Sequence, residues 1–247
     1  MSEQTNDTAA SKGGFWDTVK TIVYAVLIAL VIRTLAYEPF SIPSRSMQPT
    51  LHVGDYLFVS KFAYGYSRYS MPFSPPLFEG RVFGTEPARG DVAVFKLPSD
   101  PSVDYIKRIV GLPGDRIQVR DGILHINGEP VEREKVRSEG DGPADATIYR
   151  ETLPNGESHL IRERTDQAYL DDTRTYTVPA EHYFMMGDNR DASQDSRVQG
   201  KVGFVPFENL VGRASFIFFS FDGDTGLWEL WAWPTAIHYS RLFTGVS

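Results

Sequence analysis

An uninterrupted apolar segment near the N-terminus most constrains what this chain can fold into. Residues 21–32 carry no charge, and the stretch 18–36, with Lys20 and Arg33 extending toward the interfaces, is 19 residues long. A helix of that length spans roughly 28 Å, close to the hydrocarbon thickness of a bilayer. The pattern therefore predicts a single transmembrane anchor over residues 15–37.

Two other interpretations of this segment stay open. Thr34-Leu35-Ala36 resembles the small-x-small site at which a signal peptide is removed, and a helix buried in a soluble core would be equally apolar. Trp16 and Tyr37 favour the anchor, because they flank the segment where interfacial aromatic residues belong. Basic residues occur on both sides, so the charges do not decide the orientation. We expect residues 1–14, which are small and polar, to be disordered.

The remainder of the chain predicts a mainly β protein. Apolar alternation bounded by turn residues is typical of strands, and Asp121-Gly122 and Asn127-Gly128 are typical hairpin turns. Residues 64–90, rich in Tyr, Ser, Pro and Gly, indicate a long surface loop, and the charged residues 131–175 indicate an insertion. The strands are expected at 56–59, 91–97, 103–110, 117–119, 123–126, 174–178, 183–186 and 210–221.

The composition excludes several classes of site. The chain has no cysteine, which rules out disulfides, thiolate nucleophiles and cysteine-bound metals. Its net charge of −7, without a long basic block, gives nucleic-acid binding little support. Three of the four tryptophans lie within 228–233, where a core role and a membrane-interface role are both open. The five histidines are scattered without ligand spacing: His52, His125, His159, His182 and His238.

A serine-rich stretch, 41–51, follows the apolar segment. Two prolines, Pro43 and Pro49, stiffen it and disfavour helix. If it is extended, Ser44 and Ser46 point to one side and Arg45 to the other. Two hydroxyls on one side suit a nucleophile and an oxyanion donor, although ordinary loop serines would give the same pattern.

Lys107 lies within the predicted strand 103–110, on the same face as Val103, Tyr105 and Ile109. An ammonium group buried there without a carboxylate partner would have a lowered pKa. A neutral lysine can deprotonate a serine hydroxyl, as in Ser-Lys peptidases. An edge-strand lysine that reaches solvent is the simpler alternative.

The third polar stretch, 187–197, carries five charges between apolar strands. We expect internal ion pairs there, Asp195 with Arg197, and Asp188 or Asp191 with Arg190. A solvated loop and a calcium loop are the alternatives, but the glycine and terminal glutamate of the EF-hand pattern are missing. A serine on a loop braced in this way is suited to orient a nearby amine.

Taken together and in order, these stretches resemble bacterial type I signal peptidases. The resemblance runs from about residue 37 to residue 221, and the preceding apolar span is also a family feature. The residues that carry it are Ser44-x-Ser46-Met47-x-Pro49-Thr50-Leu51, Gly54-Asp55, Lys61-Phe62-Ala63-Tyr64-Gly65, Gly90-Asp91-Val92-x-Val94-Phe95, Asp104-Tyr105-Ile106-Lys107-Arg108-x-Val110-Gly111-Leu112-Pro113-Gly114-Asp115 and Gly187-Asp188-Asn189-Arg190-x-x-Ser193-x-Asp195-Ser196-Arg197.

The resemblance implies a role for each matching residue. Ser46 matches the nucleophile, Lys107 the general base, Ser193 the hydroxyl that orients the lysine, and Ser44 the side-chain oxyanion donor. Asp195 and Arg197 match an ion pair that braces the site. Many family members have glycine between the two serines, where this chain has Arg45. The positions matching the pockets for small substrate residues at −1 and −3 are Ile42, Met47, Leu51, Tyr105 and Ile106.

The implied fold is a mainly β, antiparallel and barrel-like catalytic core, formed by 38–130 and 176–247, with a β-rich insertion subdomain at 131–175. The implied activity is removal of signal peptides from exported preproteins, without metal or organic cofactor. The implied location is the bacterial inner membrane, with the tail 1–14 in the cytoplasm, the catalytic part on the periplasmic side, and lipid and the secretion translocon nearby. Ser46 follows Tyr37 by nine residues, so it lies at most ~30 Å from the end of the span.

Three alternatives compete with this interpretation. Self-cleaving repressors share the Ser-Lys chemistry, but they carry a DNA-binding segment where this chain has an apolar span. A Ser-His hydrolase lacks support, because no G-x-S-x-G surrounds Ser46. A membrane-anchored, non-enzymatic β protein would use the serines only structurally.

Overall fold

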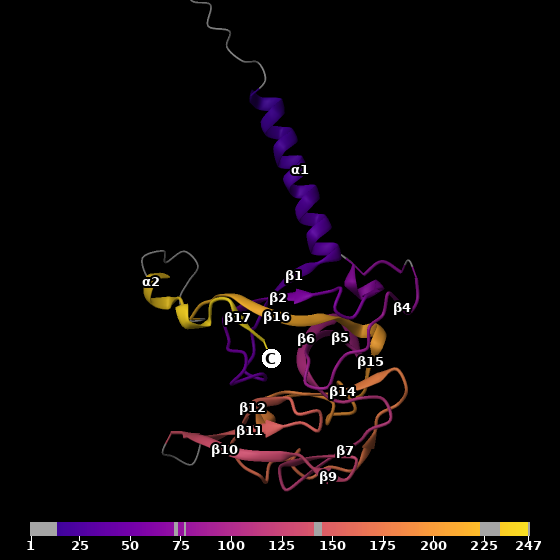
Figure 1. Cartoon of the computed structure of the whole chain (residues 1–247), viewed down its shortest axis with the longest axis vertical. Coiled ribbons are helices and arrows are strands. Elements are labelled where there is room, and N and C mark those ends of the chain that lie inside the picture. Colours follow the sequence, from indigo (N-terminus) through magenta and orange to yellow (C-terminus); the bar gives the residue numbers. More distant parts are fainter. Residues whose placement is uncertain (1–13, 72–73, 77, 141–144, 223–232, 247) are drawn as a thin grey trace, which may run out of the picture.

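The N-terminal helix stands apart from the rest of the molecule. The computed structural model describes residues 14–71, 74–76, 78–140, 145–222 and 233–246. Helix α1 (Gly14–Leu35) projects from one end of a β-rich body, and none of its residues is buried (Figure 1). Its 22 residues give a length of about 33 Å, enough to cross a membrane. The buried soluble helix is therefore wrong for this segment.

The expected end of the anchor needs a correction. The helix stops at Leu35, and Tyr37 begins strand β1 (Tyr37–Ser41) instead of closing the span. The Tyr37 ring packs on Phe58 and Phe62, with centroids 6.2 and 5.5 Å away. The expected tail, residues 1–14, lies outside the described residues except for Gly14, which starts the helix.

The large sheet next to the helix is antiparallel throughout, as predicted from the alternating strands. Its order is β1-β2-β16-β5-β6-β14-β15, and β17 pairs with β16. It holds five of the predicted strands; β2, β6 and β14 extend one to three residues beyond the predicted bounds, and β5 and β16 are each one residue shorter. The members after β1 are β2 (Asp55–Ser60), β5 (Val92–Leu97), β6 (Asp100–Gly111), β14 (His182–Met186), β15 (Val205–Pro206), β16 (Leu210–Ser220) and β17 (Thr244–Gly245).

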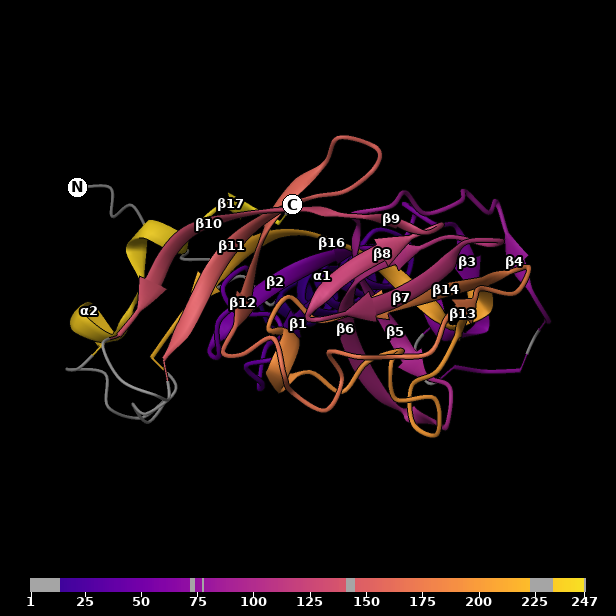
Figure 2. The same cartoon turned by 90° about the horizontal axis from the view of Figure 1, so that it is seen from below.

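Two smaller sheets lie at the end of the body away from α1 (Figures 1 and 2). One has the order β13-β7-β8-β9 and the other β10-β11-β12. The hairpin turn at Asp121-Gly122 is confirmed, because both residues have positive φ, 47° and 72°. These strands are β7 (Arg116–Arg120), β8 (Ile123–Ile126), β9 (Glu129–Pro130), β10 (Glu132–Glu139), β11 (Ala146–Thr152), β12 (Ser158–Glu163) and β13 (Tyr176–Thr177).

Strands β10 to β12 were not predicted individually. In β11 and β12 the buried positions include Ile148 and Ile161, but also Glu151, His159 and Glu163, and these polar residues obscure the apolar pattern. The division into a core of 38–130 with 176–247 and an insertion of 131–175 stays a prediction. Pairing in the sheets places β7 to β9 with β13, apart from the large sheet.

The connections contain short elements. The expected loop 64–90 includes a two-stranded sheet of β3 and β4. The tryptophan-rich segment falls outside the described residues, apart from the backbone of Trp233 at the start of α2. The short elements are β3 (Tyr66–Ser67), η1 (Arg68–Ser70), β4 (Arg81–Val82), η2 (Arg190–Ala192), η3 (Phe207–Asn209), α2 (Trp233–Ala236) and η4 (Tyr239–Arg241).

Candidate active site

The serine-rich stretch forms a bent loop on the large sheet. Backbone bonds between Ile42 and both Asp55 (2.8 Å) and Gly54 (3.0 Å) fix its beginning, directly after β1. Beyond Pro43 the chain turns instead of staying extended, and the Gln48–Pro49 peptide is cis. The expectation of an extended segment is thus wrong after residue 43, yet the two hydroxyls still meet. Ser44 Oγ lies 3.2 Å from Ser46 Oγ.

Lys107 reaches the same hydroxyl from β6. Its Nζ donates to Ser46 Oγ at 2.7 Å and to the Ile106 carbonyl at 2.8 Å, and lies 5.3 Å from the centre of the Tyr105 ring. The side chain is 3% exposed and has no ion pair with any described carboxylate. Burial lowers the pKa of Lys107 to about 8, although the charges of Asp195 and Asp188 oppose the shift.

This pairing has a simple chemical meaning. A lysine whose pKa lies near neutrality is partly uncharged at working pH, so its lone pair is available to accept a proton. The acceptor lies within hydrogen-bond reach of a nearly buried serine, which is 7% exposed. The Ser46 N–H makes no hydrogen bond within the described residues, and the Ser44 hydroxyl lies beside the Ser46 hydroxyl. The arrangement combines a nucleophile, a base and two candidate oxyanion donors.

Ser193 lies close to the pair but is not bonded to the lysine. It follows η2 and is 5% exposed, and its Oγ makes no hydrogen bond of good geometry among the described residues, although it lies close enough to the Asp195 carboxylate to help lower the pKa of Asp195. Gly187 lies between Ser193 and the loop that carries Ser46. A Cβ at Gly187 would lie 2.2 Å from Ser193 Oγ and 2.5 Å from the Ser46 carbonyl oxygen, so this close approach requires glycine.

The ion pair expected between Asp195 and Arg197 is present and buried. Arg197 Nε and Nη2 each lie 2.9 Å from an oxygen of Asp195, and Asp195 also accepts the Gly187 N–H at 3.1 Å. Burial alone would raise the pKa of Asp195, but the Arg197 guanidinium holds it below its usual value. The pair therefore connects the Ser193 loop to the end of β14.

The other expected pairs in this loop are wrong. Asp188 accepts two bonds from the Arg108 side chain, at 2.9 and 2.8 Å, and does not pair with Arg190. Arg190 bonds instead to Glu151 on β11, at 2.9 Å. Arg190 does not pair with the aspartates next to it in the sequence because η2 turns its side chain away from the loop and toward the insertion sheet. The Arg190 side chain is 2% exposed there.

Asn189 is a positioning residue that the sequence motif contained but did not explain. Its N–H donates to the Ser46 carbonyl at 3.1 Å, and its side-chain amide donates to the Arg45 carbonyl at 2.9 Å. Thr50 ties the other end of the loop to Asp188 at 2.5 Å. The Gly-Asp-Asn-Arg run was a visible signal, but its partners lie from 39 to 144 positions away in the sequence and appear only in three dimensions. The Arg45 side chain itself is exposed.

A cavity of about 730 Å³ opens beside the two serines and Lys107. It extends to Arg33 and Glu38, at the end of α1, so the reactive group shares one cleft with the membrane-proximal end of the body. Ile42, Tyr105 and Ile106 line this cavity, as expected of substrate-contacting residues. Met47 and Leu51 are fully buried in the apolar cluster beneath it and do not line it.

A cluster of acidic side chains lies away from this cavity. Within the described ranges, three acidic side chains at Glu163, Asp171 and Asp191 are close enough to share a cation. None of them contacts Ser46 or Lys107. The groups of the cavity nearest to the reaction are the Ser44 and Ser46 hydroxyls and the Lys107 amine.

Comparison with known proteins identifies the family of this chain. Residues 15–219 match the family described as "Signal peptidase, peptidase S26". Signal peptidase I of Rickettsia typhi is 43% identical over 90% of this chain and 90% of its own length, and that of Rickettsia canadensis is 42% identical over 97% and 94%. A crystal structure of a signal peptidase I from Enterococcus faecalis V583 is 26% identical and covers 52% of this chain and 97% of its own, with a TM-score of 0.33, too low to compare the folds.

The family match runs from the anchor helix into β16, and the two relatives cover 90% and 97% of the chain. The chain therefore belongs to the signal peptidase family, the S26 serine endopeptidases that remove signal peptides from preproteins.

Proposed function

We propose that this chain cleaves signal peptides with a Ser46–Lys107 dyad. The observation that carries the proposal is the 2.7 Å hydrogen bond between Lys107 Nζ and Ser46 Oγ in a site that excludes solvent. The lowered pKa of Lys107, about 8, supports a neutral amine as the base. No charged partner has to be displaced before it accepts a proton.

The reaction is an acyl transfer in two halves. Lys107 takes the proton of Ser46, and Ser46 Oγ attacks the carbonyl carbon of the scissile bond. The oxyanion is held by the Ser44 hydroxyl and the Ser46 N–H, each of a donor class worth roughly 3–4 kcal/mol. The carbon–nitrogen bond then breaks as Lys107 returns the proton to the leaving amine, and water, activated by the same amine, releases the acyl group.

Ser193 is proposed as a positioning residue for the lysine. Lys107 has three N–H donors when charged, and two bonds, to Ser46 and Ile106, are made by the described residues. The Ser193 hydroxyl, across Gly187 from the Ser46 carbonyl, is the candidate third partner. The Asp195–Arg197 pair would keep its loop in place.

Ile42, Tyr105 and Ile106 are proposed to contact the small residues at −3 and −1 of the preprotein, because they line the cavity beside Ser46. Met47 and Leu51 would act through packing beneath these pockets. We place the anchor in the bacterial inner membrane, with the body on the periplasmic side near the translocon and lipid. The cavity's extension to Arg33 and Glu38 supports this, since a signal-peptide cleavage site also lies just outside the membrane.

The test is cleavage of one purified preprotein by the full chain in detergent. Ser46→Ala and Lys107→Ala should each reduce kcat at least roughly a thousandfold while the chain stays folded, because each removes a group that makes or breaks bonds. Ser240→Ala and Lys135→Ala, at exposed positions away from the cavity, are the matched controls. Cleavage by Lys107→Ala at a near wild-type rate would show that another base acts.

A further inference from the structure

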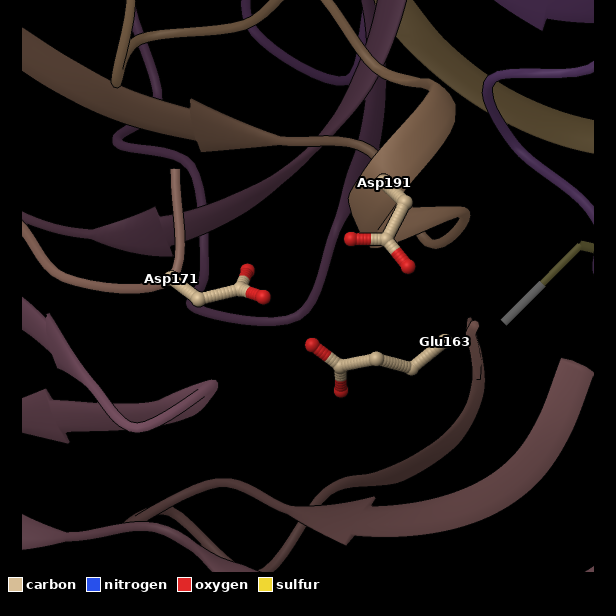
Figure 3. Close-up of side chains that lie close together, drawn as sticks. All are labelled: Glu163, Asp171 and Asp191. Atoms are coloured by element: carbon tan, nitrogen blue, oxygen red, sulfur yellow. The ribbon is translucent and has the colours of Figure 1, made fainter. Parts of the chain in front are cut away.

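Three carboxylates from separate segments converge near η2. Glu163 ends β12, Asp171 lies in the following loop, and Asp191 is the middle residue of η2. One oxygen of each lies within 4.8 Å of one oxygen of both others. Figure 3 shows the three side chains pointing toward one another. Glu163 and Asp171 are buried, and Asp191 is half-buried, which leaves a way in from solvent.

Protein donors occupy only part of this cluster. Each carboxylate has one oxygen held by a hydrogen bond from outside the cluster. A second oxygen, Oδ1, of both Asp171 and Asp191 is shielded from solvent and meets no donor among the described residues. Asp171 is 1% exposed, so its free oxygen faces the cluster and not water. The donors are the Ala168 N–H to Asp171 (2.6 Å), the Arg164 N–H to Asp191 (2.6 Å) and the Arg133 guanidinium to Glu163 (2.8 Å).

The positive charges nearby do not balance the cluster. Arg133 is shared between Glu163 and Asp166, the latter at 3.0 Å, and Arg190 is engaged by Glu151. A buried carboxylate oxygen without a donor is unfavourable unless a proton or a cation meets it.

We propose that Glu163, Asp171 and Asp191 bind one hard divalent cation, Ca²⁺ or Mg²⁺. Carboxylate oxygens are the ligands these ions prefer, and two oxygens on opposite sides of Ca²⁺, each at about 2.4 Å, lie up to about 4.8 Å apart. Backbone carbonyls and water complete the coordination of such ions in many proteins.

The position of this site gives the cation a structural role. It would join the insertion strand β12, the loop 164–175 and η2, and Asp191 precedes Ser193 by only two residues. The ion would thus hold the beginning of the loop that carries Ser193, Asp195 and Arg197. It would not touch Ser46 or Lys107, so it is a brace and not a participant in the reaction.

The first experiment titrates the full chain, in detergent and freed of metal with a chelator, with CaCl₂ and separately with MgCl₂ by calorimetry. The wild type should bind one ion per chain. The ion that binds with the higher affinity is the preferred one. Asp171→Asn and Asp191→Asn should each weaken binding roughly tenfold or more, because each replaces a charged ligand. Glu134→Gln removes a charge from the exposed face of the same insertion sheet and should bind like the wild type.

The second experiment compares melting temperatures with chelator and with saturating salt. With chelator, Asp171→Asn should melt at or above the wild-type temperature, because it relieves repulsion between carboxylates. With the salt it should melt below the wild type, because it gains less from the ion. This change of sign separates a cation site from a cluster that shares a proton.

Two results would overturn the proposal. One is the absence of saturable binding of either ion to the wild type. The other is binding that survives unchanged in both Asp→Asn variants, which would place the ion elsewhere. Both readouts are independent of peptide cleavage, so they leave the assignment of Ser46 and Lys107 untouched.

Discussion

At the scale of single residues, Lys107 is held in surroundings that favour its neutral form. The two nearest carboxylates that would stabilise its charge, Asp195 and Asp188, are already engaged by Arg197 and Arg108. Burial therefore outweighs their attraction. Strand alternation predicted the apolar face of β6 on which Lys107 lies. The ion pair of Asp188 with Arg108 was not predictable, since Asp188 was expected to pair within its own loop.

The buried lysine should lower the stability of the wild type near neutral pH. The difference between 10.5 and about 8 for its pKa corresponds to roughly 3 kcal/mol. Below pH 8 both the folded and the unfolded chain carry the proton, so the folded state bears the full penalty. Between pH 8 and 10.5 the unfolded chain binds more protons, and the penalty disappears as pH rises.

At pH 7 the free energy of unfolding of Lys107→Met should therefore be higher than that of the wild type by about 1–2 kcal/mol. This figure allows for the loss of two hydrogen bonds. The advantage should shrink toward pH 10.5. Chemical denaturation at a series of pH values measures it. If the variant is less stable than the wild type at pH 7, burial does not destabilise the charged form of Lys107.

At the scale of elements, the insertion sheet supports the catalytic loop. The Arg162 N–H on β12 donates to the Asp188 carbonyl at 2.8 Å, and Glu151 on β11 binds Arg190 at the start of η2. The strands of the large sheet were predictable because apolar residues alternate in them. Strands β10 to β12 were not, because their charged faces make these contacts with groups distant in sequence.

Breaking the Glu151–Arg190 pair should be costly. Both side chains are 2% exposed, so Glu151→Ala would leave a buried guanidinium unpaired and lower the free energy of unfolding by about 3–5 kcal/mol. Replacing both with methionine should recover most of that loss, since no buried charge remains. Thermal and urea unfolding of the two variants measure the difference. If both variants lose the same free energy of unfolding, the loss comes from the missing ion pair and not from the unpaired guanidinium.

At the scale of the whole molecule, the anchor and the body are nearly independent. Helix α1 buries no residue, and its described links to the body include the Arg33–Glu38 ion pair (3.0 Å) and the bond from the Tyr66 hydroxyl to the Leu35 carbonyl (2.5 Å). The apolar run predicted the helix from sequence alone. The cavity that connects its end to Ser46 depends on the packing of β1 against β2 and was not predictable.

Removal of residues 1–35 should leave the body folded. Surface contacts of this kind contribute about 1 kcal/mol or less each, so the melting temperature should change little. The truncated chain should still cleave a short peptide that lacks the apolar part of a signal peptide. Calorimetry and a peptide assay test this. A body that unfolds, or that loses cleavage of the short peptide, would show that α1 completes the fold or the site.

The dependence of cleavage on pH tests the central claim most directly. If neutral Lys107 activates Ser46, the single-turnover rate of preprotein cleavage should rise about tenfold per pH unit below pH 8 and level off above it, because the fraction of neutral amine does so. Lys135→Ala, which changes an exposed lysine, should give the same profile. A rate that stays constant from pH 6 to 10 would contradict the dyad.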